Sequence, residues 1–325
     1  MNAEHSLEKL CSTAHFLVID DFESFRLSIV SMLTSYGAQS IDMAANAQQA
    51  LNLARYKNYD VILCDFDLGS GKNGQQIIEE LRLSERLKRT QLFIMITADT
   101  SKEVVLSTRE FYPDAFIAKP ITKQVFRERL NQLLQQQISL KPINKEIDVK
   151  NYSKAISLCA GHITKKSKYR AWCLQTQASL YCELGDISNA KTIYSDVLGK
   201  RPIDWAMLGL GRVMYEEKKY QDSKNLYQDI IKRSPYMIEA YDGVSNSCLQ
   251  MGQLYEAQQA LEEAVSFSPR AVKRQSKLGE LCLINQNIEA AARAYRHARQ
   301  YGENSIHDTP ELHLNLANCL CDMIE

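Results

Sequence analysis

A spacing of 33 or 34 residues recurs through the second half of the chain and restricts the folds that it can adopt. Small residues return at this spacing, at Ala190, Ser223, Ala257 and Ala291. Large side chains stand four residues after each of them, at Tyr194, Tyr227, Leu261 and Tyr295. Prolines end three of these segments, at Pro202, Pro235 and Pro269. Small residues let two antiparallel helices approach closely, and proline separates one pair from the next, so the spacing predicts an all-α solenoid of stacked helix pairs.

These segments resemble the tetratricopeptide repeat. Leu210–Gly211 and Leu278–Gly279 occupy equivalent places in the predicted first helices, followed by a small residue, an aromatic residue and proline, as in that family. The resemblance covers residues 171–302 as about four full repeats. Residues 151–164 look like the second helix of an incomplete repeat.

The chain ends on what looks like another first helix. Leu316 and Ala317 take the place of the Leu-Gly pair, and no partner helix follows in the sequence. A solenoid normally closes on a polar cap, so either this helix itself caps the array or the sequence is part of a longer protein, and we favour the second interpretation. We assign residues 151–325 to the helical-repeat domain. The resemblance implies that this domain binds a protein whose identity the sequence does not give.

The first 140 residues have a different period, in which short apolar strands alternate with amphipathic helices. The strand candidates are residues 16–20, 40–45, 61–65, 92–97 and 115–119. Strands that alternate with helices predict a doubly wound α/β domain with a five-stranded parallel sheet covered on both faces. We assign residues 15–138 to this domain, residues 1–14 to an N-terminal extension and residues 139–150 to a linker.

Polar residues stand at the ends of four of these strands. Asp20 and Asp21 end the first, Asp65 the third, Thr97 the fourth and Lys119 the fifth. Because working groups of a doubly wound sheet lie at the carboxyl ends of its strands, we expect these side chains to gather at one edge. Asp65 alone fits a metal ligand, a nucleophile or an ordinary turn, since glycines follow it in the run "DFDLGSGKNG".

As a set, these residues resemble the receiver domain of bacterial two-component response regulators, a flavodoxin-like fold. The resemblance implies that Asp65 is the phosphoacceptor, forming an aspartyl phosphate. It implies that Asp20, Asp21 and Asp65 hold Mg²⁺, or Mn²⁺, together with the backbone carbonyl of Asp67. Lys119 would neutralise a phosphoryl oxygen, and the Thr97 hydroxyl would donate a hydrogen bond to another.

The resemblance assigns further roles near these strand ends. Phe116 matches the switch aromatic, whose rotamer follows Thr97, and Pro120 matches a proline preceded by a cis peptide bond. Asp67 and Asp99 stand where the family tunes hydrolysis of the phosphoryl group. Gly69 departs from the pattern, because the family usually has proline there.

The resulting interpretation is a response regulator that is phosphorylated on Asp65 by a sensor histidine kinase or a phosphotransfer protein and signals through its repeats. Beyond its own phosphorylation and dephosphorylation, we expect no enzymatic activity. The changed receiver surface would bind the repeats, a partner, or a second receiver in a homodimer. The alternatives are an adaptor or phosphate sink, a phosphatase for small phosphate esters with a nucleophilic Asp65, and a scaffold that works without phosphorylation.

Composition narrows the remaining possibilities. Thirty-nine basic residues balance thirty-nine acidic ones, and neither half has the basic excess of a nucleic-acid binder, so we predict no nucleic-acid partner. No apolar run reaches the length of a membrane span, and the N-terminus lacks the basic residues of a signal peptide. We therefore expect a cytoplasmic protein without a membrane partner. The nine cysteines have no zinc-like spacing and are interpreted as small core residues.

Overall fold

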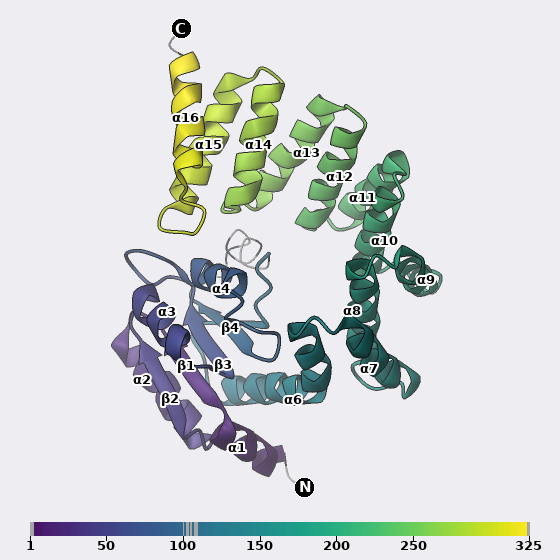
Figure 1. The fold of residues 1–325 in the computed structure, drawn as a ribbon. Coiled ribbons are helices and arrows are strands. Elements are labelled where there is room, and N and C mark those ends of the chain that lie inside the picture. Colours follow the sequence, from purple (N-terminus) through teal and green to yellow (C-terminus); the bar gives the residue numbers. More distant parts are fainter. Residues whose placement is uncertain (1–2, 100, 102–103, 105, 107–109, 324–325) are drawn as a thin grey trace. The chain divides into compact units, whose positions relative to one another are not determined.

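The computed structural model describes residues 3–99, 101, 104, 106 and 110–323 (Figure 1). The chain divides into two compact units, of which the first covers Met1–Lys150 and the second begins at Asn151. The first unit contains the sheet and the second is helical, as the change of period predicts.

The first unit is built on a five-stranded parallel sheet. Its strands are β1 (His15–Ile19), β2 (Ser40–Ala44), β3 (Val61–Asp65), β4 (Leu92–Thr97) and β5 (Ala115–Ala118). Their order in the sheet is β2-β1-β3-β4-β5, and every neighbouring pair is parallel. The predicted α/β class is confirmed, and β1 and β3 lie side by side at the centre of the sheet.

Helices cover both faces of this sheet. They are α1 (Ala3–Thr13), α2 (Glu23–Ser35), α3 (Ala47–Tyr56), α4 (Gly74–Leu83) and α6 (Lys123–Asp148). Successive residues of each strand point to opposite faces. Phe16 and Val18 of β1 pack with α1, α2 and α6, whereas Leu17 and Ile19 pack with α3 and α4. The strands are therefore buried on both sides, so polar side chains can reach solvent and ligands only at the strand ends.

Two segments that the sequence places outside the α/β domain are helical and belong to the first unit. The extension forms α1, which buries Leu7 and Cys11 in the core. The predicted linker, residues 139–150, continues α6 as far as Asp148. Pro142 lies inside this helix, where proline removes one backbone hydrogen bond and crowds the preceding turn. Apolar residues that continue at helical spacing and are buried at Leu140, Ile143 and Ile147 offset this cost.

The end of α6 is also fixed to the sheet by hydrogen bonds. The Asp148 carboxylate accepts from the backbone N–H groups of Arg89 and Thr90, at 2.8 and 3.2 Å, and from the Thr90 hydroxyl at 3.0 Å. Residues 89 and 90 lie in the turn before β4, which begins at Leu92. The segment expected to be a linker is therefore an ordered part of the first unit.

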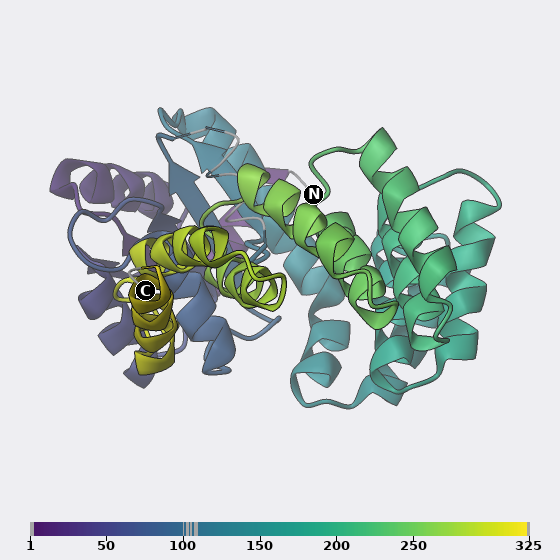
Figure 2. The ribbon, with the colours of Figure 1, turned by 90° about the horizontal axis from the view of Figure 1, so that it is seen from above.

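The second unit consists of helices that run antiparallel to their neighbours (Figures 1 and 2). They are α7 (Tyr152–Thr164), α8 (Arg170–Glu183), α9 (Ile187–Leu198), α10 (Asp204–Glu216), α11 (Tyr220–Arg233), α12 (Ile238–Gln250), α13 (Leu254–Phe267), α14 (Val272–Ile284), α15 (Ile288–Gly302) and α16 (Pro310–Asp322). The pairs α8–α9, α10–α11, α12–α13 and α14–α15 are the four predicted repeats. The solenoid prediction is confirmed.

The recurring small and large residues meet where the sequence predicts close packing. Ala190, Ser223, Ala257 and Ala291 are all 0 % exposed. A Cβ added to Gly211 would lie 2.8 Å from the Tyr227 ring, and one added to Gly279 would lie 2.7 Å from the Tyr295 ring. In these two helix pairs, the glycine of the first helix thus makes room for the tyrosine of the second helix. Among the described helices, none combines the length and apolar character needed to cross a membrane.

Candidate functional site

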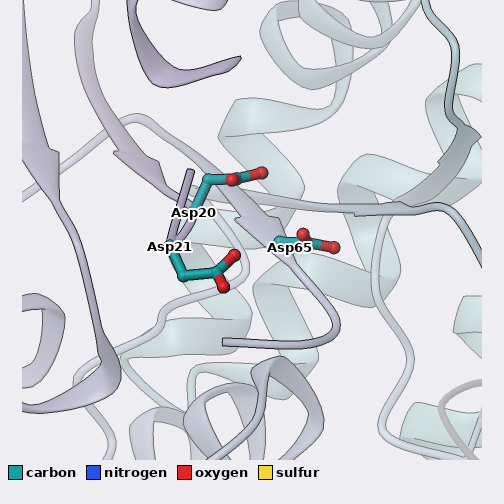
Figure 3. Close-up of side chains that lie close together, drawn as sticks. All are labelled: Asp20, Asp21 and Asp65. Atoms are coloured by element: carbon teal, nitrogen blue, oxygen red, sulfur yellow. The ribbon is translucent and has the colours of Figure 1, made fainter. Parts of the chain in front are cut away.

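Three carboxylates meet at the carboxyl ends of the two central strands. Asp65 is the last residue of β3, and Asp20 and Asp21 directly follow β1. One oxygen from each side chain lies within 4.8 Å of the others (Figure 3). Asp20 and Asp65 are buried, whereas Asp21 is exposed. The sheet thus brings together residues that are 45 positions apart, as the strand-end pattern predicts.

Hydrogen bonds fix the backbone around the two adjacent acids. The Phe22 N–H donates to Asp20 Oδ1 at 2.9 Å. One guanidinium nitrogen of Arg26, in the first turn of α2, donates to the backbone carbonyls of Asp20 at 2.6 Å and Asp21 at 3.1 Å. Arg26 belongs to no motif in the sequence, and its position in the first turn of the following helix is the available signal.

Lys119 connects the buried carboxylates from the edge strand. This residue directly follows β5, and its Nζ lies 2.7 Å from Asp20 Oδ2 and 2.5 Å from Asp65 Oδ2. The other oxygen of Asp65 accepts from the Phe66 N–H at 2.7 Å. The Lys119–Pro120 peptide bond is cis, as the resemblance implies. Three carboxylates thus face one ammonium group, which leaves an excess of negative charge.

This arrangement shifts the proton affinity of two groups. Burial raises the pKa of Asp65 from 3.8 to about 6, against the opposing effect of the Lys119 hydrogen bond and charge, and the neighbouring Asp20 charge adds to the rise. For Lys119, burial lowers the pKa, but the hydrogen bonds to Asp20 and Asp65 outweigh it, so that its pKa is raised. Lys119 therefore stays charged, while Asp65 binds a proton more readily than an ordinary carboxylate.

Thr97 and Phe116 occupy the neighbouring strands on the Lys119 side. Thr97 is buried at the end of β4, and its hydroxyl donates to the Asp99 carbonyl at 3.2 Å and accepts from the Asp99 N–H at 3.0 Å. Phe116 is partly buried in β5 and packs against the core beneath α3 and α4. Thr97 thus ends its strand at the same edge of the sheet as Asp65, whereas Phe116 pairs with Met95, further back along the sheet. Their switch role remains a prediction.

The loop after Asp65 is held by its own polar groups. Asp67 is exposed, and its side chain accepts from the Gly69 N–H at 3.1 Å. Gly69 has a φ of +73° and Gly71 a φ of +98°, conformations that glycine adopts without strain. Asp99 is also exposed and accepts from the Ser101 N–H at 2.8 Å. The roles of Asp67 as a metal ligand through its carbonyl, and of both acids in hydrolysis, remain predictions.

The loop ends where α4 begins, directly against the acceptor strand. Asn73 and Gln76 form a reciprocal capping box at the start of this helix. A Cβ on Gly74 would lie 2.2 Å from the Asp65 carbonyl oxygen, so only glycine allows this approach. This contact was not predicted from the sequence, although Asn followed three residues later by Gln is a capping-box pattern that marks the start of the helix.

The acidic cluster fits a small divalent cation. Carboxylate oxygens are the hard ligands that Mg²⁺ takes, and Mg²⁺ typically uses one or two carboxylates while keeping several waters. The exposed side of the cluster at Asp21 gives water access, and the excess negative charge favours a cation. Within the described residues, this is the one group of acids, histidines and cysteines close enough to hold a metal ion.

Comparison with known proteins defines the class of both units. Residues 16–131 match the model of the response regulator receiver domain, and residues 205–235 match a tetratricopeptide repeat. The chain therefore carries an N-terminal receiver domain of the CheY-like type, followed by tetratricopeptide repeats.

The curated relatives match the first unit. The chain is 25% identical over 120 residues to the chemotaxis protein CheY of Pseudomonas aeruginosa, which covers 37% of this chain and 95% of that protein. It is 24% identical over 120 residues to CheY-3 of Vibrio cholerae, covering 37% of this chain and 91% of that protein. These relatives support a response regulator.

Solved structures resemble parts of the chain. A CheY-like receiver domain protein of Methanospirillum hungatei has a TM-score of 0.36 at 23% identity, over 39% of this chain and 97% of that one. MamA of Desulfovibrio magneticus has a TM-score of 0.43 at 19% identity, over 51% of this chain and 93% of that one.

Proposed function

We propose that this protein is a response regulator of a two-component system, which accepts a phosphoryl group on Asp65 and signals through protein–protein contacts of its repeats. The donor is a sensor histidine kinase or a phosphotransfer protein. One observation carries the proposal: the Asp65 carboxylate ends a central strand with two further acids and the Lys119 ammonium around it. The receiver match over residues 16–131 supports it.

The chemical step is a displacement at phosphorus. An Asp65 carboxylate oxygen forms the new O–P bond, the N–P bond of a phosphohistidine breaks, and the imidazole leaves with the electron pair. A bound Mg²⁺ supplies charge neutralisation between the carboxylate and the phosphoryl oxygens. Asp20, Asp21, Asp65 and the Asp67 carbonyl would hold that ion. Asp65 must be ionised to attack, which its pKa of about 6 allows at neutral pH.

Lys119 and Thr97 act on the transferred group. Lys119 already contacts Asp65 Oδ2, so its ammonium needs only a small displacement to pair with a phosphoryl oxygen. The Thr97 hydroxyl, now bonded to the Asp99 backbone, would exchange those bonds for a phosphoryl oxygen. Phe116 would then move with Thr97 and change the surface around β5. A kinase, an unidentified partner of the repeats and a second receiver are the proposed partners.

Intact-mass analysis tests the chemistry. The protein is incubated with acetyl phosphate, with and without Mg²⁺, beside Asp65→Asn and Asp42→Asn variants. Asp42 is a control because it lies on β2 and bonds to Lys57 and Tyr59. One phosphoryl group should be added to the wild type and to Asp42→Asn, only with Mg²⁺, and none to Asp65→Asn.

Other outcomes would identify a different function. Repeated turnover of a simple phosphomonoester would indicate a phosphatase, and the absence of any adduct, with a kinase as well as with acetyl phosphate, would indicate a scaffold. A stable adduct that leaves partner binding by the repeats unchanged would favour the adaptor or phosphate sink.

A further inference from the structure

An aromatic ring that the receiver chemistry does not require lies against the Lys119 ammonium. Phe25 belongs to the first turn of α2, and Lys119 Nζ lies 4.1 Å from the centre of its ring. This distance is well within the range of a cation–π contact. Phe25 also packs against the core formed by α1, α2 and α6, and this packing restricts the movement of its ring.

The ammonium group is therefore held by three partners at once. Asp20 and Asp65 accept its hydrogen bonds at 2.7 and 2.5 Å, and Phe25 supplies the face of its ring. The Lys119 side chain is only 15 % exposed, and a cation–π contact is stronger where water is excluded. A leucine at position 25 would keep an apolar contact and lose the attraction to the cation.

The position of this ammonium has two opposite consequences for the site. Lys119 occupies Asp20 Oδ2 and Asp65 Oδ2, so holding it there competes with a divalent cation that needs the same carboxylates. The same placement prepares a positive charge beside Asp65, where negative charge arrives during phosphoryl transfer, and groups placed in advance stabilise such charge best.

We propose that Phe25 is the positioning residue of Lys119: its ring holds the ammonium beside Asp20 and Asp65, weakening Mg²⁺ binding and favouring phosphoryl transfer. The second consequence rests on the proposed function, whereas the first depends only on the acidic cluster. If Phe25 were simply a packing residue, its loss would loosen the start of α2, which carries Arg26, and would weaken both properties together.

The experiment measures both properties on the full chain. Isothermal titration calorimetry gives the Mg²⁺ affinity, and intact mass gives the rate of phosphorylation by acetyl phosphate at saturating Mg²⁺. For Phe25→Leu we expect Mg²⁺ affinity to rise about two- to fivefold and the rate to fall by a similar factor. Phe25→Tyr keeps the ring and should leave both values close to those of the wild type.

A matched control separates this effect from loss of packing. Phe126 is fully buried in the same core and packs beside Tyr36. Phe126→Leu removes the same atoms as Phe25→Leu, so it should lower stability without raising Mg²⁺ affinity.

Each contrary result has a distinct meaning. Mg²⁺ affinity that falls or stays constant in Phe25→Leu overturns the proposal, as does a Phe25→Tyr variant that behaves like Phe25→Leu. If acetyl phosphate labels no variant, wild type included, the proposed function fails, and the Mg²⁺ titration still decides whether Phe25 positions Lys119.

Discussion

The two units of this protein differ in how far apart along the chain their contacting residues lie. At the edge of the sheet, Asp20, Asp65 and Lys119 come from strands far apart in the chain and meet through their side chains. In the repeats, the packing contacts join mostly helices that are neighbours along the chain, as Gly211 of α10 does with Tyr227 of α11. Substitutions at the sheet edge should therefore change chemistry, whereas substitutions in the repeats should change stability.

The largest expected effect is a loss of stability in the repeats. Tyr227→Ala removes a ring that fits against Gly211 and Gly243, and truncation of a buried aromatic residue costs about 3–5 kcal/mol. The chain has two tryptophans, Trp172 and Trp205, and both lie in the second unit, so tryptophan fluorescence during denaturation reports its unfolding.

Phosphorylation of Tyr227→Ala by acetyl phosphate should be unchanged if the two units work as described. Tyr255→Ala, at a tyrosine that is 67% exposed on α13, is the control and should be close to neutral. A large loss of phosphorylation in Tyr227→Ala alone would contradict the separation between chemistry and packing.

The next largest effect is the pH dependence of the first unit without Mg²⁺. Asp65 has its pKa raised from 3.8 to about 6, so the folded protein binds a proton that the unfolded chain has released. The Asp65 contribution to the free energy of unfolding should be constant below pH 4 and fall as pH rises to about 6, by up to about 3 kcal/mol. Hydrogen exchange of the β1 and β3 amides measures this free energy at each pH.

Asp65→Asn supplies the control for this pH profile, because the amide does not titrate in this range. In this variant the free energy of unfolding should not fall between pH 4 and 6, and Mg²⁺ should reduce the fall in the wild type by favouring the charged carboxylate. An identical profile in the wild type and in Asp65→Asn would show that another group is responsible.

A smaller effect is expected where α4 meets the acceptor strand. Gly74→Ala forces a methyl group against the Asp65 carbonyl, and overpacking of this kind costs about 1–3 kcal/mol. The displaced strand end should also slow phosphorylation. Gly161→Ala is the counterpart in the repeats, where nothing lies within 4 Å of the added atom, and it should be neutral or slightly stabilising.

The smallest effect concerns Arg26. Arg26→Met removes the hydrogen bonds to the Asp20 and Asp21 carbonyls, and a net loss of about 1 kcal/mol corresponds to a roughly fivefold weaker Mg²⁺ affinity. Calorimetry measures the Mg²⁺ affinity of this variant and of the control Arg129→Met, which changes an exposed arginine of α6. Equal affinities in the two variants would show that Arg26 does not position the acids.

The residues that the sequence predicted well are those whose place follows from periodicity alone. Asp20, Asp65, Thr97 and Lys119 end strands of one parallel sheet, and parallel strands must bring those ends to one edge. The small and large residues of the repeats were predictable for the same reason, since a fixed period fixes their register.

Contacts that depend on how elements pack were not predictable. Phe25 meets Lys119 only because the fold places the start of α2 within reach of the Lys119 side chain, and no spacing in the sequence encodes that approach. Gly74 looks like an ordinary loop glycine until α4 is seen to start against Asp65. The continuation of α6 past Pro142 depends on the buried residues that follow and on the Asp148 hydrogen bonds, which outweigh the usual effect of proline.

The central claim is that Asp65, and no other carboxylate of the sheet edge, takes the phosphoryl group. Borohydride reduces an acyl phosphate to the alcohol, so reduction after incubation with acetyl phosphate and Mg²⁺, followed by peptide mapping, marks the acceptor permanently. The account predicts homoserine in place of Asp65 alone, and none without Mg²⁺. Reduction at Asp20, Asp21 or Asp67, or equal labelling without Mg²⁺, would contradict it.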